Sequence, residues 1–377
     1  MGFAPGPPRD SSIRVNLRQL PLLLMSLLPP LAAADQRPAS DQPPGGLAAA
    51  RVPQFVLLGF DDNPDAAAMT WFVDALKDQR NPAGAARAAT FDGGPVRAIF
   101  FSNGRYWNDR ALISIHHRAL SEGHEIANHT QNHDHGGAFT VAKWRTEMAA
   151  CEATFAETGI PAAGVVGFRT PFLEYNAKTF EALVHEEQVY DSSIEEGEQA
   201  SQDGTNFFWP YTLDHGSPGN AADYPEGSPK RVGQHPGLWE IPIHVFLIPP
   251  DEECAAYGAT PGLRARIGTA LKAAYGGGSG EPTGKITGLD WNVVEAAKCS
   301  GPELLAILKY SLDRRLAGNR APFMVGGHTA LYPANKPDRR KAIEDFVAYA
   351  LTKPEVRFVT GKQLLGWLRA PQALGGN

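Results

Sequence analysis

Cysteine is scarce in this chain, and so are basic clusters and long hydrophobic runs. The 377 residues include three cysteines, too few for a fold held together by disulfides. Lysine and arginine total 35 against 41 acidic residues, without a basic run, which argues against binding to nucleic-acid phosphates. The 39 glycines and 31 prolines show no three-residue period, so collagen is excluded. With 43% hydrophobic residues, the chain has enough apolar side chains for a large globular core.

The longest apolar run lies near the N-terminus, at residues 20–31 (LPLLLMSLLPPL). Three arginines precede it and three alanines follow it, which is the order of a secretory signal peptide. The run is too short for a permanent membrane span, and its two prolines would break a helix. The sequence therefore predicts cleavage near Ala34, removal of residues 1–34, and a secreted protein, periplasmic or extracellular. The alternative is a disordered apolar N-terminus or a retained anchor, and no other segment is a candidate membrane span.

The rest of the chain predicts one large domain. Residues 35–52 mix proline, glycine, alanine and polar residues, so we expect a flexible lead-in before a domain at 53–370 and a tail at 371–377. In the domain, apolar runs alternate with segments of helical period, which predicts α/β architecture with parallel strands closed as a (β/α)7–8 barrel. The expected strands lie at 54–60, 96–101, 124–127, 164–168, 189–194, 239–246, 323–326 and 356–359.

In such barrels the reactive side chains lie at the C-terminal ends of the strands. His129 and His133 follow one expected strand and are four residues apart, a spacing that suits a helical turn and a shared metal. A carboxylate would complete a three-ligand site with an open position, where zinc lowers the pKa of water to roughly 7. The HExxH signature is not present, and two ordinary surface histidines are the alternative.

Asp61 and Asp62 directly follow the expected strand at 54–60. Adjacent residues at a strand end point in different directions, so one carboxylate can bind a metal while the other acts as a base. The alternative is that the pair caps the following helix.

Four strand ends carry short sequences in a fixed order: GFDDNP (59–64), GHEIANHTQNH (123–133), GFRTPF (167–172) and FMVGGH (323–328). This order resembles the polysaccharide deacetylases, the NodB-homology carbohydrate esterases of family four, over about residues 54–369. Segments such as PGLWEIP (236–242) and NRAPF (319–323) look most similar to chitin deacetylases. Two residues depart from the usual first motif, since Gly59 stands for Thr and Asn63 for Gly. The fourth motif, D-x-x-D-W, is not recognised, which leaves the acid beside the catalytic histidine unassigned.

The resemblance implies a distorted barrel of the deacetylase type. It also implies metal-dependent hydrolysis of the N-acetyl group of N-acetylglucosamine units in a polysaccharide such as chitin. Asp62, His129 and His133 would bind the metal, with Zn²⁺ expected and Co²⁺ as the alternative. Asp61 would act as the base toward a metal-bound water, and His328 as the acid that protonates the departing amine. The alternative for His328 is a buried core histidine.

Other implied residues would support the reaction. Arg169 would pair with Asp61 and hold it ionised, unless it forms only a structural ion pair. The backbone N–H of Phe172 would stabilise the oxyanion. Pro171, Phe172 and Trp239 would contact the substrate, with Trp239 as an apolar wall beside the acetyl group.

Two other functions stay open at this level. The same chemistry suits deacetylation of peptidoglycan, an exopolysaccharide or an O-acetyl ester, and a silent barrel could bind carbohydrate without reacting. A pure binder would not need the acid, the base and three metal ligands. His135, close to the histidine pair, is one further candidate residue. No pattern in the sequence predicts an oligomeric state.

The cysteines support one more expectation. Cys254 and Cys299 flank an insertion-like excursion at 251–300, and in an exported protein they are candidates for a disulfide at its base. Cys151 would remain, buried in a helix.

Overall fold

The computed structural model of the protein describes residues 36–276 and 284–375. The predicted signal peptide at 1–34 lies outside the described residues. The described chain folds around a sheet with the strand order β12-β1-β2-β3-β4-β5-β8-β7, and β13 pairs with β1. All pairs in this sheet are parallel except β7 with β8. The strands are β1 (Gln54–Asp62), β2 (Ile99–Ser102), β3 (Glu125–Asn128), β4 (Gly167–Phe168), β5 (Tyr190–Asp191), β7 (Tyr211–Leu213), β8 (His235–Glu240), β12 (Phe323–His328) and β13 (Val356–Phe358).

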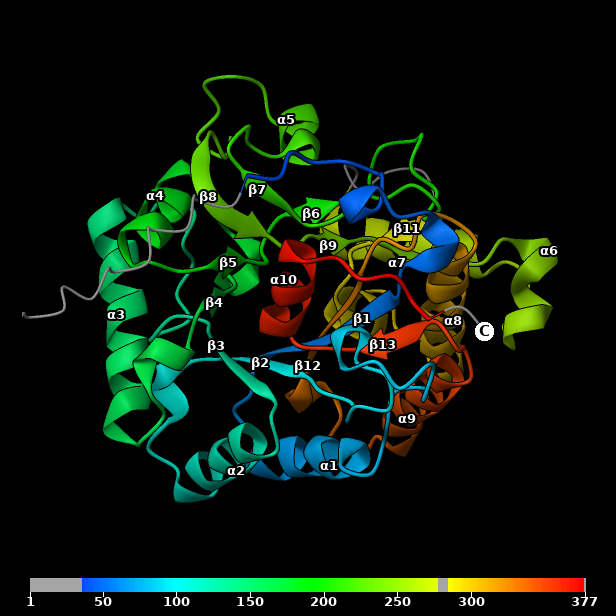
Figure 1. Ribbon diagram of the computed structural model, residues 1–377, viewed down its shortest axis with the longest axis horizontal. Coiled ribbons are helices and arrows are strands. Elements are labelled where there is room, and N and C mark those ends of the chain that lie inside the picture. The colour runs from blue at the N-terminus through cyan, green and yellow to red at the C-terminus, as the bar shows by residue number, and fades with distance from the viewer. Residues whose placement is uncertain (1–35, 277–283, 376–377) are drawn as a thin grey trace, which may run out of the picture. The chain divides into compact units, whose positions relative to one another are not determined.

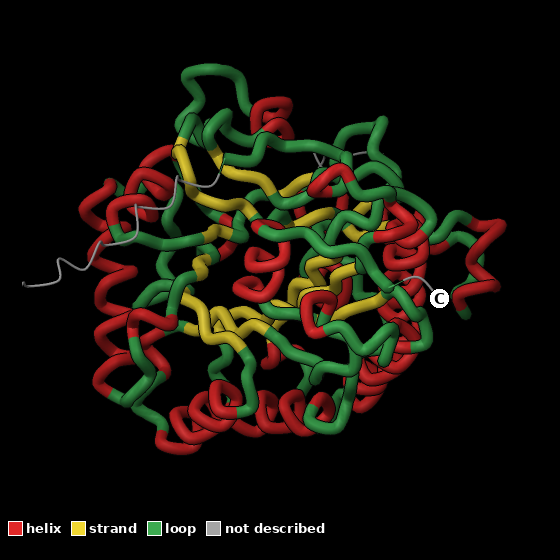
Figure 2. The backbone as a smooth tube through the Cα atoms, in the orientation of Figure 1, coloured by secondary structure: helices red, strands yellow, loops and turns green. Residues whose placement is uncertain are grey.

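The sheet curls into an incomplete barrel with helices around its outside (Figure 1; Figure 2). Two short strand pairs stand apart from it, β6 (Glu195–Glu196) with β9 (Ile243–His244) and β10 (Phe246–Leu247) with β11 (Lys285–Ile286). The prediction of an α/β barrel with parallel strands is therefore confirmed, and each expected strand has a counterpart. The antiparallel strand β7 was not expected.

The helices begin where short polar side chains cap them. Asp65 accepts hydrogen bonds from the first N–H groups of α1, Thr140 caps α3, and Ser300 forms a capping box with Glu303 at the start of α8. The α-helices are α1 (Ala66–Leu76), α2 (Arg110–Ser121), α3 (Val141–Glu157), α4 (Ala177–His185), α5 (Pro218–Asp223), α6 (Asp251–Cys254), α7 (Leu263–Tyr275), α8 (Gly301–Leu316), α9 (Pro337–Leu351) and α10 (Gly361–Arg369).

The core has two parts because side chains of a strand alternate between its two faces. In β1, Val56 and Leu58 pack outward, in the cluster that contains the apolar side chains of α1, α8 and α9. Phe55 and Leu57 belong to the inner cluster, together with residues of α10. Strand β1 is thus buried on both faces, as expected for a central parallel strand.

The register of the parallel strands brings their C-terminal ends to one edge. Asp61 lies opposite His328 of β12, and Asp62 lies opposite Ser102 of β2. Ser102 in turn lies opposite Asn128, the residue before the first histidine of the predicted metal pair. Residues far apart in the sequence therefore meet where the strands end.

Helix α10 packs at the opposite edge, where the strands begin. The backbone N–H of Lys362 donates to the carboxylate of Glu125 at the start of β3, over 3.0 Å. The two ends of the described domain meet near this edge, since the N–H of Leu374 donates to the carbonyl of Arg51 over 2.7 Å.

The segment that we expected to be a flexible lead-in is hydrogen-bonded to the barrel. The N–H of Thr212 donates to the carbonyl of Arg37 over 2.8 Å, and the N–H of Trp209 donates to the carbonyl of Ser40 over 2.9 Å. The open edge of β7 offers backbone groups that need partners, and this segment supplies them.

The expected disulfide is not formed, because Cys254 and Cys299 are both free thiols. Both side chains are buried in the outer apolar cluster, where they pack as small hydrophobic residues. Cys299 also accepts a hydrogen bond from the guanidinium of Arg266, over 3.5 Å. Cys151 is buried in α3, as expected. Across residues 36–276 and 284–375, no helix is both long and apolar enough to cross a membrane.

A buried ion pair joins β13 to the loop before β2. Arg357 Nη2 lies 2.6 Å from Asp92 Oδ1, and neither side chain is exposed. Arg357→Ala leaves the Asp92 carboxylate buried without an opposite charge, although the N–H groups of Ala85 and Arg87 still donate to it. We therefore expect a loss of about 3–5 kcal/mol in unfolding free energy. Urea unfolding monitored by circular dichroism measures it. The matched control is Lys341→Ala, which removes an exposed pair and should cost less than about 1 kcal/mol. Equal losses in both variants would contradict the prediction.

Candidate active site

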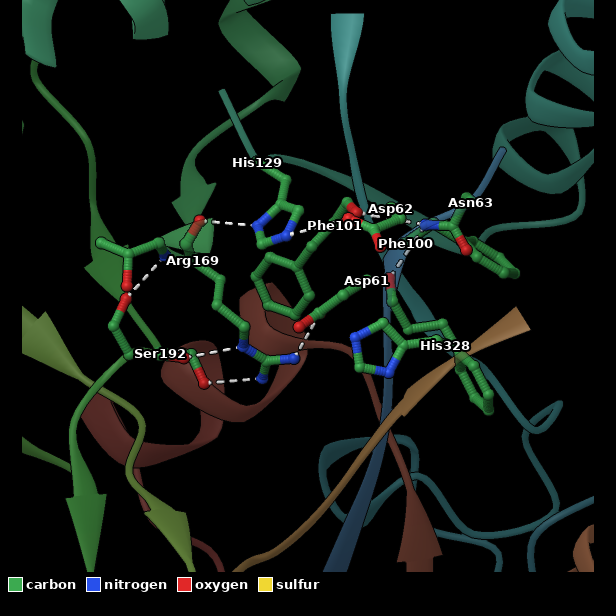
Figure 3. A network of polar contacts seen from close by, with 12 residues as sticks. Asp61, Asp62, Asn63, Phe100, Phe101, His129, Arg169, Ser192 and His328 are labelled. Carbon is green, nitrogen blue, oxygen red and sulfur yellow. Dashed lines mark hydrogen bonds and ion pairs between the residues drawn. The ribbon is translucent and has the colours of Figure 1, made fainter. Parts of the chain in front are cut away.

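The C-terminal edge of the sheet borders a cavity of about 870 Å³. Most of the predicted polar site residues line it, although they come from different strand ends (Figure 3). These lining residues are Asp61, Asp62, His129, His133 and His328.

The end of β1 turns sharply, because Asp62 and Asn63 both have left-handed backbones, with φ of 64° and 53°. Asn63 is buried, and its side-chain amide donates to the carbonyls of Phe60 (2.9 Å) and Phe101 (3.2 Å). Asparagine tolerates a positive φ better than most residues. Its side chain ties the turn to β2, which accounts for asparagine where the family motif has glycine.

Gly59, the other departure from the motif, faces a filled space. A Cβ at this position would lie 2.8 Å from the sulfur of Met324 and 3.2 Å from the ring of Phe101. A larger side chain here would require Met324 to move, so glycine suits the packing of β12 against β1.

Asp62, His129 and His133 form a cluster that fits a divalent cation. Asp62 Oδ1 lies 3.0 Å from His133 Nε2 and 3.4 Å from His129 Nε2. The three ligand atoms all lie within 4.8 Å of one another. Asp62 Oδ1 is buried and accepts no hydrogen bond from the described residues. One carboxylate oxygen and two imidazole nitrogens facing a common point are the donor set of an open zinc site.

Hydrogen bonds fix the orientation of His129. Its Nδ1 lies 2.8 Å from the carbonyl oxygen of Arg169, which can only accept, so Nδ1 carries the proton and Nε2 keeps its lone pair for a metal. The side-chain amide of Asn103 donates to the backbone carbonyl of His129.

His133 lies in a loop and not on a helical turn, so the helical interpretation of its spacing is wrong. Thr130 and His133 have φ of 70° and 55°, and the N–H of His133 donates to Thr130 Oγ1 over 3.1 Å. Helix α3 anchors this loop, because buried Glu147 accepts from the N–H of Asn132 over 2.9 Å. The loop folds back and brings both imidazoles to one point.

Asp61 is held by Arg169, as the resemblance implied. Arg169 Nη1 donates to Asp61 Oδ1 over 2.7 Å, and both side chains are buried. The other donors of Arg169 go to Ser192, with Nε to the carbonyl at 2.7 Å and Nη2 to Oγ at 3.0 Å. The guanidinium also lies 4.0 Å from the centre of the Phe101 ring (Figure 3). Arg169 therefore fixes the direction of the Asp61 carboxylate.

His328 is held by Asp290, which our sequence analysis missed. Asp290 Oδ1 lies 2.7 Å from His328 Nδ1, and its Oδ2 accepts from the His328 N–H over 2.9 Å. Burial lowers the pKa of His328, but the charge and hydrogen bond of Asp290, with Asp61 and Asp62, outweigh it and raise the pKa to about 9. The imidazole is therefore protonated at neutral pH. The pair Asp290-Trp291 is the D-W end of the motif that was not recognised, because it lies inside the excursion at 251–300.

The apolar wall of the cavity comes from Trp291 and not from Trp239. Trp239 is 2% exposed and belongs to the inner core with Tyr190. Trp291 is 51% exposed, lines the cavity and has its ring centre 6.3 Å from that of His328. The interpretation of Trp239 as a substrate contact is corrected accordingly. The tryptophan next to Asp290 is the signal that could have identified the wall.

The loop after β4 supplies the remaining predicted residues. Phe172 is 53% exposed and lines the cavity. Pro171, the other predicted substrate contact of this loop, is buried and does not belong to the cavity lining. The φ of Phe172 is 58°, and the role of its N–H toward an oxyanion stays a prediction. His135 lies outside the metal cluster: its ring stacks on Phe172 with the centres 4.0 Å apart, and its Nδ1 is 3.0 Å from Glu174 Oε1.

Comparison with known proteins agrees with this geometry. Residues 49–187 match the family model for polysaccharide deacetylase. Chitin deacetylase 1 of Bombyx mori is 24% identical over 339 residues, which is 88% of this chain and 54% of that protein. Chitin deacetylase 8 of Bombyx mori is 27% identical over 215 residues, which is 55% of this chain and 51% of that protein. The chain thus spans about half the length of these curated relatives.

The fold also has a solved counterpart. A putative polysaccharide deacetylase from Mycobacterium smegmatis has a TM-score of 0.53 at 15% identity, covering 91% of this chain and 99% of that one. The family match spans the metal cluster, Asp61, Arg169 and Phe172, and the likeness of fold extends over the whole barrel. Residues 49–187 therefore match the polysaccharide deacetylase family, and the chain shares the fold of that solved protein.

Proposed function

We propose that this protein is a metal-dependent deacetylase of N-acetylglucosamine units in a polysaccharide such as chitin, and that it releases acetate. One observation carries the proposal. A carboxylate held by a buried arginine lies next to a three-residue cation site, and a protonated histidine borders the same cavity. These are the base, the electrophile site and the acid that amide hydrolysis needs.

Asp62, His129 and His133 would hold the cation, with Zn²⁺ favoured by the nitrogen and oxygen donors and Co²⁺ as the alternative. When bound, such a cation polarises a carbonyl oxygen and makes a water more acidic. All three residues line the cavity, so a cation held by them would be accessible from it.

Asp61 would accept the proton of the attacking water. Its hydrogen bond to Arg169 fixes the carboxylate at the cavity lining. Asp61 Oδ1 is bonded to Arg169, and Asp61 does not belong to the cluster of Asp62, His129 and His133.

His328 would donate a proton to the amide nitrogen as the carbon–nitrogen bond breaks. Water adds to the acetyl carbon, the amine leaves with the proton from His328, and acetate remains. Asp290 keeps His328 charged for this step. The N–H of Phe172 would stabilise the oxyanion, and Trp291 would border the acetyl methyl group.

The names of the two silkworm relatives favour chitin as the substrate. Peptidoglycan, an exopolysaccharide or an O-acetyl ester would use the same base and acid. A silent carbohydrate-binding barrel is less supported, because it would have no use for this set of reactive side chains. We also propose secretion after removal of residues 1–34, based on the sequence of that segment.

Asp61→Asn tests the base. The amide cannot accept the proton, so we expect acetate release from chitin oligomers to fall by about 10²–10⁴-fold. Acetate is measured by an enzyme-coupled assay with Zn²⁺ added, and Asp65→Asn, at the cap of α1, is the control with normal activity. Release by the natural protein from O-acetyl esters alone would reject the amide substrate. Binding of glycans without release of acetate from any of them would favour the silent barrel.

His133→Ala tests the metal site. The variant keeps two of three ligands, so we expect zinc affinity to fall by at least about a hundredfold. Isothermal titration of the metal-free protein with Zn²⁺ gives the affinity and the stoichiometry, expected to be one ion per chain. His117→Ala, in α2, removes a histidine outside the cluster and should bind zinc normally. Equal zinc affinities in the natural protein and in His133→Ala would show that zinc binds elsewhere.

Asp290→Asn tests the acid. In the natural protein, activity should persist up to about pH 9 and fall above it, because His328 acts in its protonated form and its pKa is about 9. The asparagine removes the charge that raises this pKa, so the alkaline limb of the kcat profile should move to lower pH by about one unit or more. The control Asp338→Asn, at the start of α9, should show the same alkaline limb as the natural protein. An unchanged limb in Asp290→Asn would exclude His328 as the titrating acid.

A further inference from the structure

Two fully buried carboxyl side chains, Asp191 and Glu240, lie at the C-terminal ends of β5 and β8. The two residues are opposite each other in the parallel register of these strands. Burying a carboxyl group is costly unless the group is hydrogen-bonded, so each of them needs partners. The mechanism proposed above gives neither residue a role, although both lie at the edge of the sheet that carries the site.

The two carboxyl groups differ in protonation. Burial raises the pKa of Glu240 well above its usual range, and the charge of Asp191 raises it further. Burial also raises the pKa of Asp191, to about 6, and the hydrogen bond from Glu240 limits this rise. At neutral pH, Glu240 is therefore a protonated acid that donates to Asp191, and Asp191 is an ionised carboxylate that only accepts hydrogen bonds.

Asp191 determines how Ser193 uses its hydroxyl group. The Asp191 carboxylate accepts from the N–H of Ser193 over 2.9 Å and from its hydroxyl over 2.8 Å. Because the single hydroxyl proton points to Asp191, Ser193 Oγ can accept from the N–H of Thr170, over 2.9 Å. Thr170 follows Arg169, so the buried carboxylate is linked to the backbone next to the arginine that holds the proposed base.

The same loop holds the side chain of Arg169 (Figure 3). Ser192, the neighbour of Asp191, accepts from the guanidinium with its carbonyl over 2.7 Å and with its Oγ over 3.0 Å. The hydroxyl proton of Ser192 points to the carbonyl of Ile241, over 2.8 Å, which leaves its lone pairs for Arg169. Both acceptors of the guanidinium in this loop thus directly follow Asp191 in the chain.

We propose that Asp191 is a positioning residue that acts on Asp61 through Arg169. Its carboxylate holds the loop of Ser192 and Ser193, the loop holds the guanidinium, and the guanidinium fixes the proposed base. An ionised carboxylate suits this place because it accepts from both the N–H and the hydroxyl of the same serine. This inference rests on the proposed function, in which Asp61 is the base.

Asp191→Asn tests the contacts without a measurement of activity. The asparagine has one acceptor oxygen, so its NH₂ group faces a donor of Ser193 that the carboxylate accepted. We expect the loop to loosen its hold on Arg169. In protein labelled with ¹⁵N-arginine, the Nε–H of Arg169 should exchange its proton with solvent at least about tenfold faster than in the natural protein. Loss of the signal in Arg169→Lys assigns it.

Turnover gives a second measurement. Asp191 does not belong to the cavity lining, so Asp191→Asn should lower kcat for acetate release from chitin oligomers by about 10–100-fold with little change in KM. In the Asp61→Asn background the same substitution should cause little further loss, because a residue that positions the base has nothing left to position. A merely structural role would give additive losses.

Two other buried acids provide matched controls. Glu240→Gln can still donate to Asp191 from its NH₂ group, so it should keep most of the natural kcat. Glu125 is 1% exposed and lies at the start of β3, on the opposite edge of the sheet. Glu125→Gln should leave both kcat and the exchange of the Arg169 Nε–H at their natural values.

Ser193→Ala is the second variant if Asp191→Asn does not fold, since it removes only the hydroxyl link and should show both changes to a smaller extent. Unchanged exchange at Arg169, an unchanged kcat or additive losses with Asp61→Asn would overturn the inference and keep the proposed function. If the natural protein releases no acetate from any acetylated glycan, the proposed function fails, and the exchange measurement alone decides whether Asp191 holds Arg169.

Discussion

A guanidinium group without exposed surface is stable in a protein only where its donors and its charge are matched, and Arg169 meets this condition at the centre of the site. One nitrogen donates to Asp61, the other two donate to Ser192, and the ring of Phe101 covers the face of the group. The carbonyl of the same residue accepts from His129. Arg169 thus positions the proposed base through its side chain and a proposed metal ligand through its backbone. Base and ligand cannot move independently.

The sequence was sufficient to predict the alternation of strands and helices and most of the residues at the strand ends. Asp61, Asp62, His129 and Arg169 each directly follow or end an apolar run, and parallel strands bring such positions to a common edge. Local patterns and topology therefore led to the same residues. The structure places most of them around one cavity. Single motifs could suggest this arrangement but could not show it.

What the sequence did not predict depends on contacts between distant segments. Asp290 reaches His328 from a region without a clear strand–helix period, so its short D-W signal was overlooked. Trp239 was predicted to be the apolar wall beside the acetyl group, but its side chain packs in the inner core. Cys254 and Cys299 remain free thiols, although their positions on either side of the excursion at 251–300 suggested a disulfide. The histidine pair has helical spacing, yet positive φ values at Thr130 and His133 place it in a loop. Backbone conformation and burial decide these cases, and a single sequence reports neither directly.

The domain has two edges with different properties, because parallel strands all start on one side. Arg51 and Leu374 are joined by a hydrogen bond just ahead of β1, whereas Asp61 and Asp62 lie at its other end. Strand β1 has nine residues, and its eight steps of about 3.3 Å separate its two ends by roughly 26 Å. A tether, a surface or a neighbouring module attached near Arg51 or Leu374 would hold the domain at the edge where the strands begin. A polymer substrate too large to enter any pocket could then pass across the opposite edge without meeting the attachment.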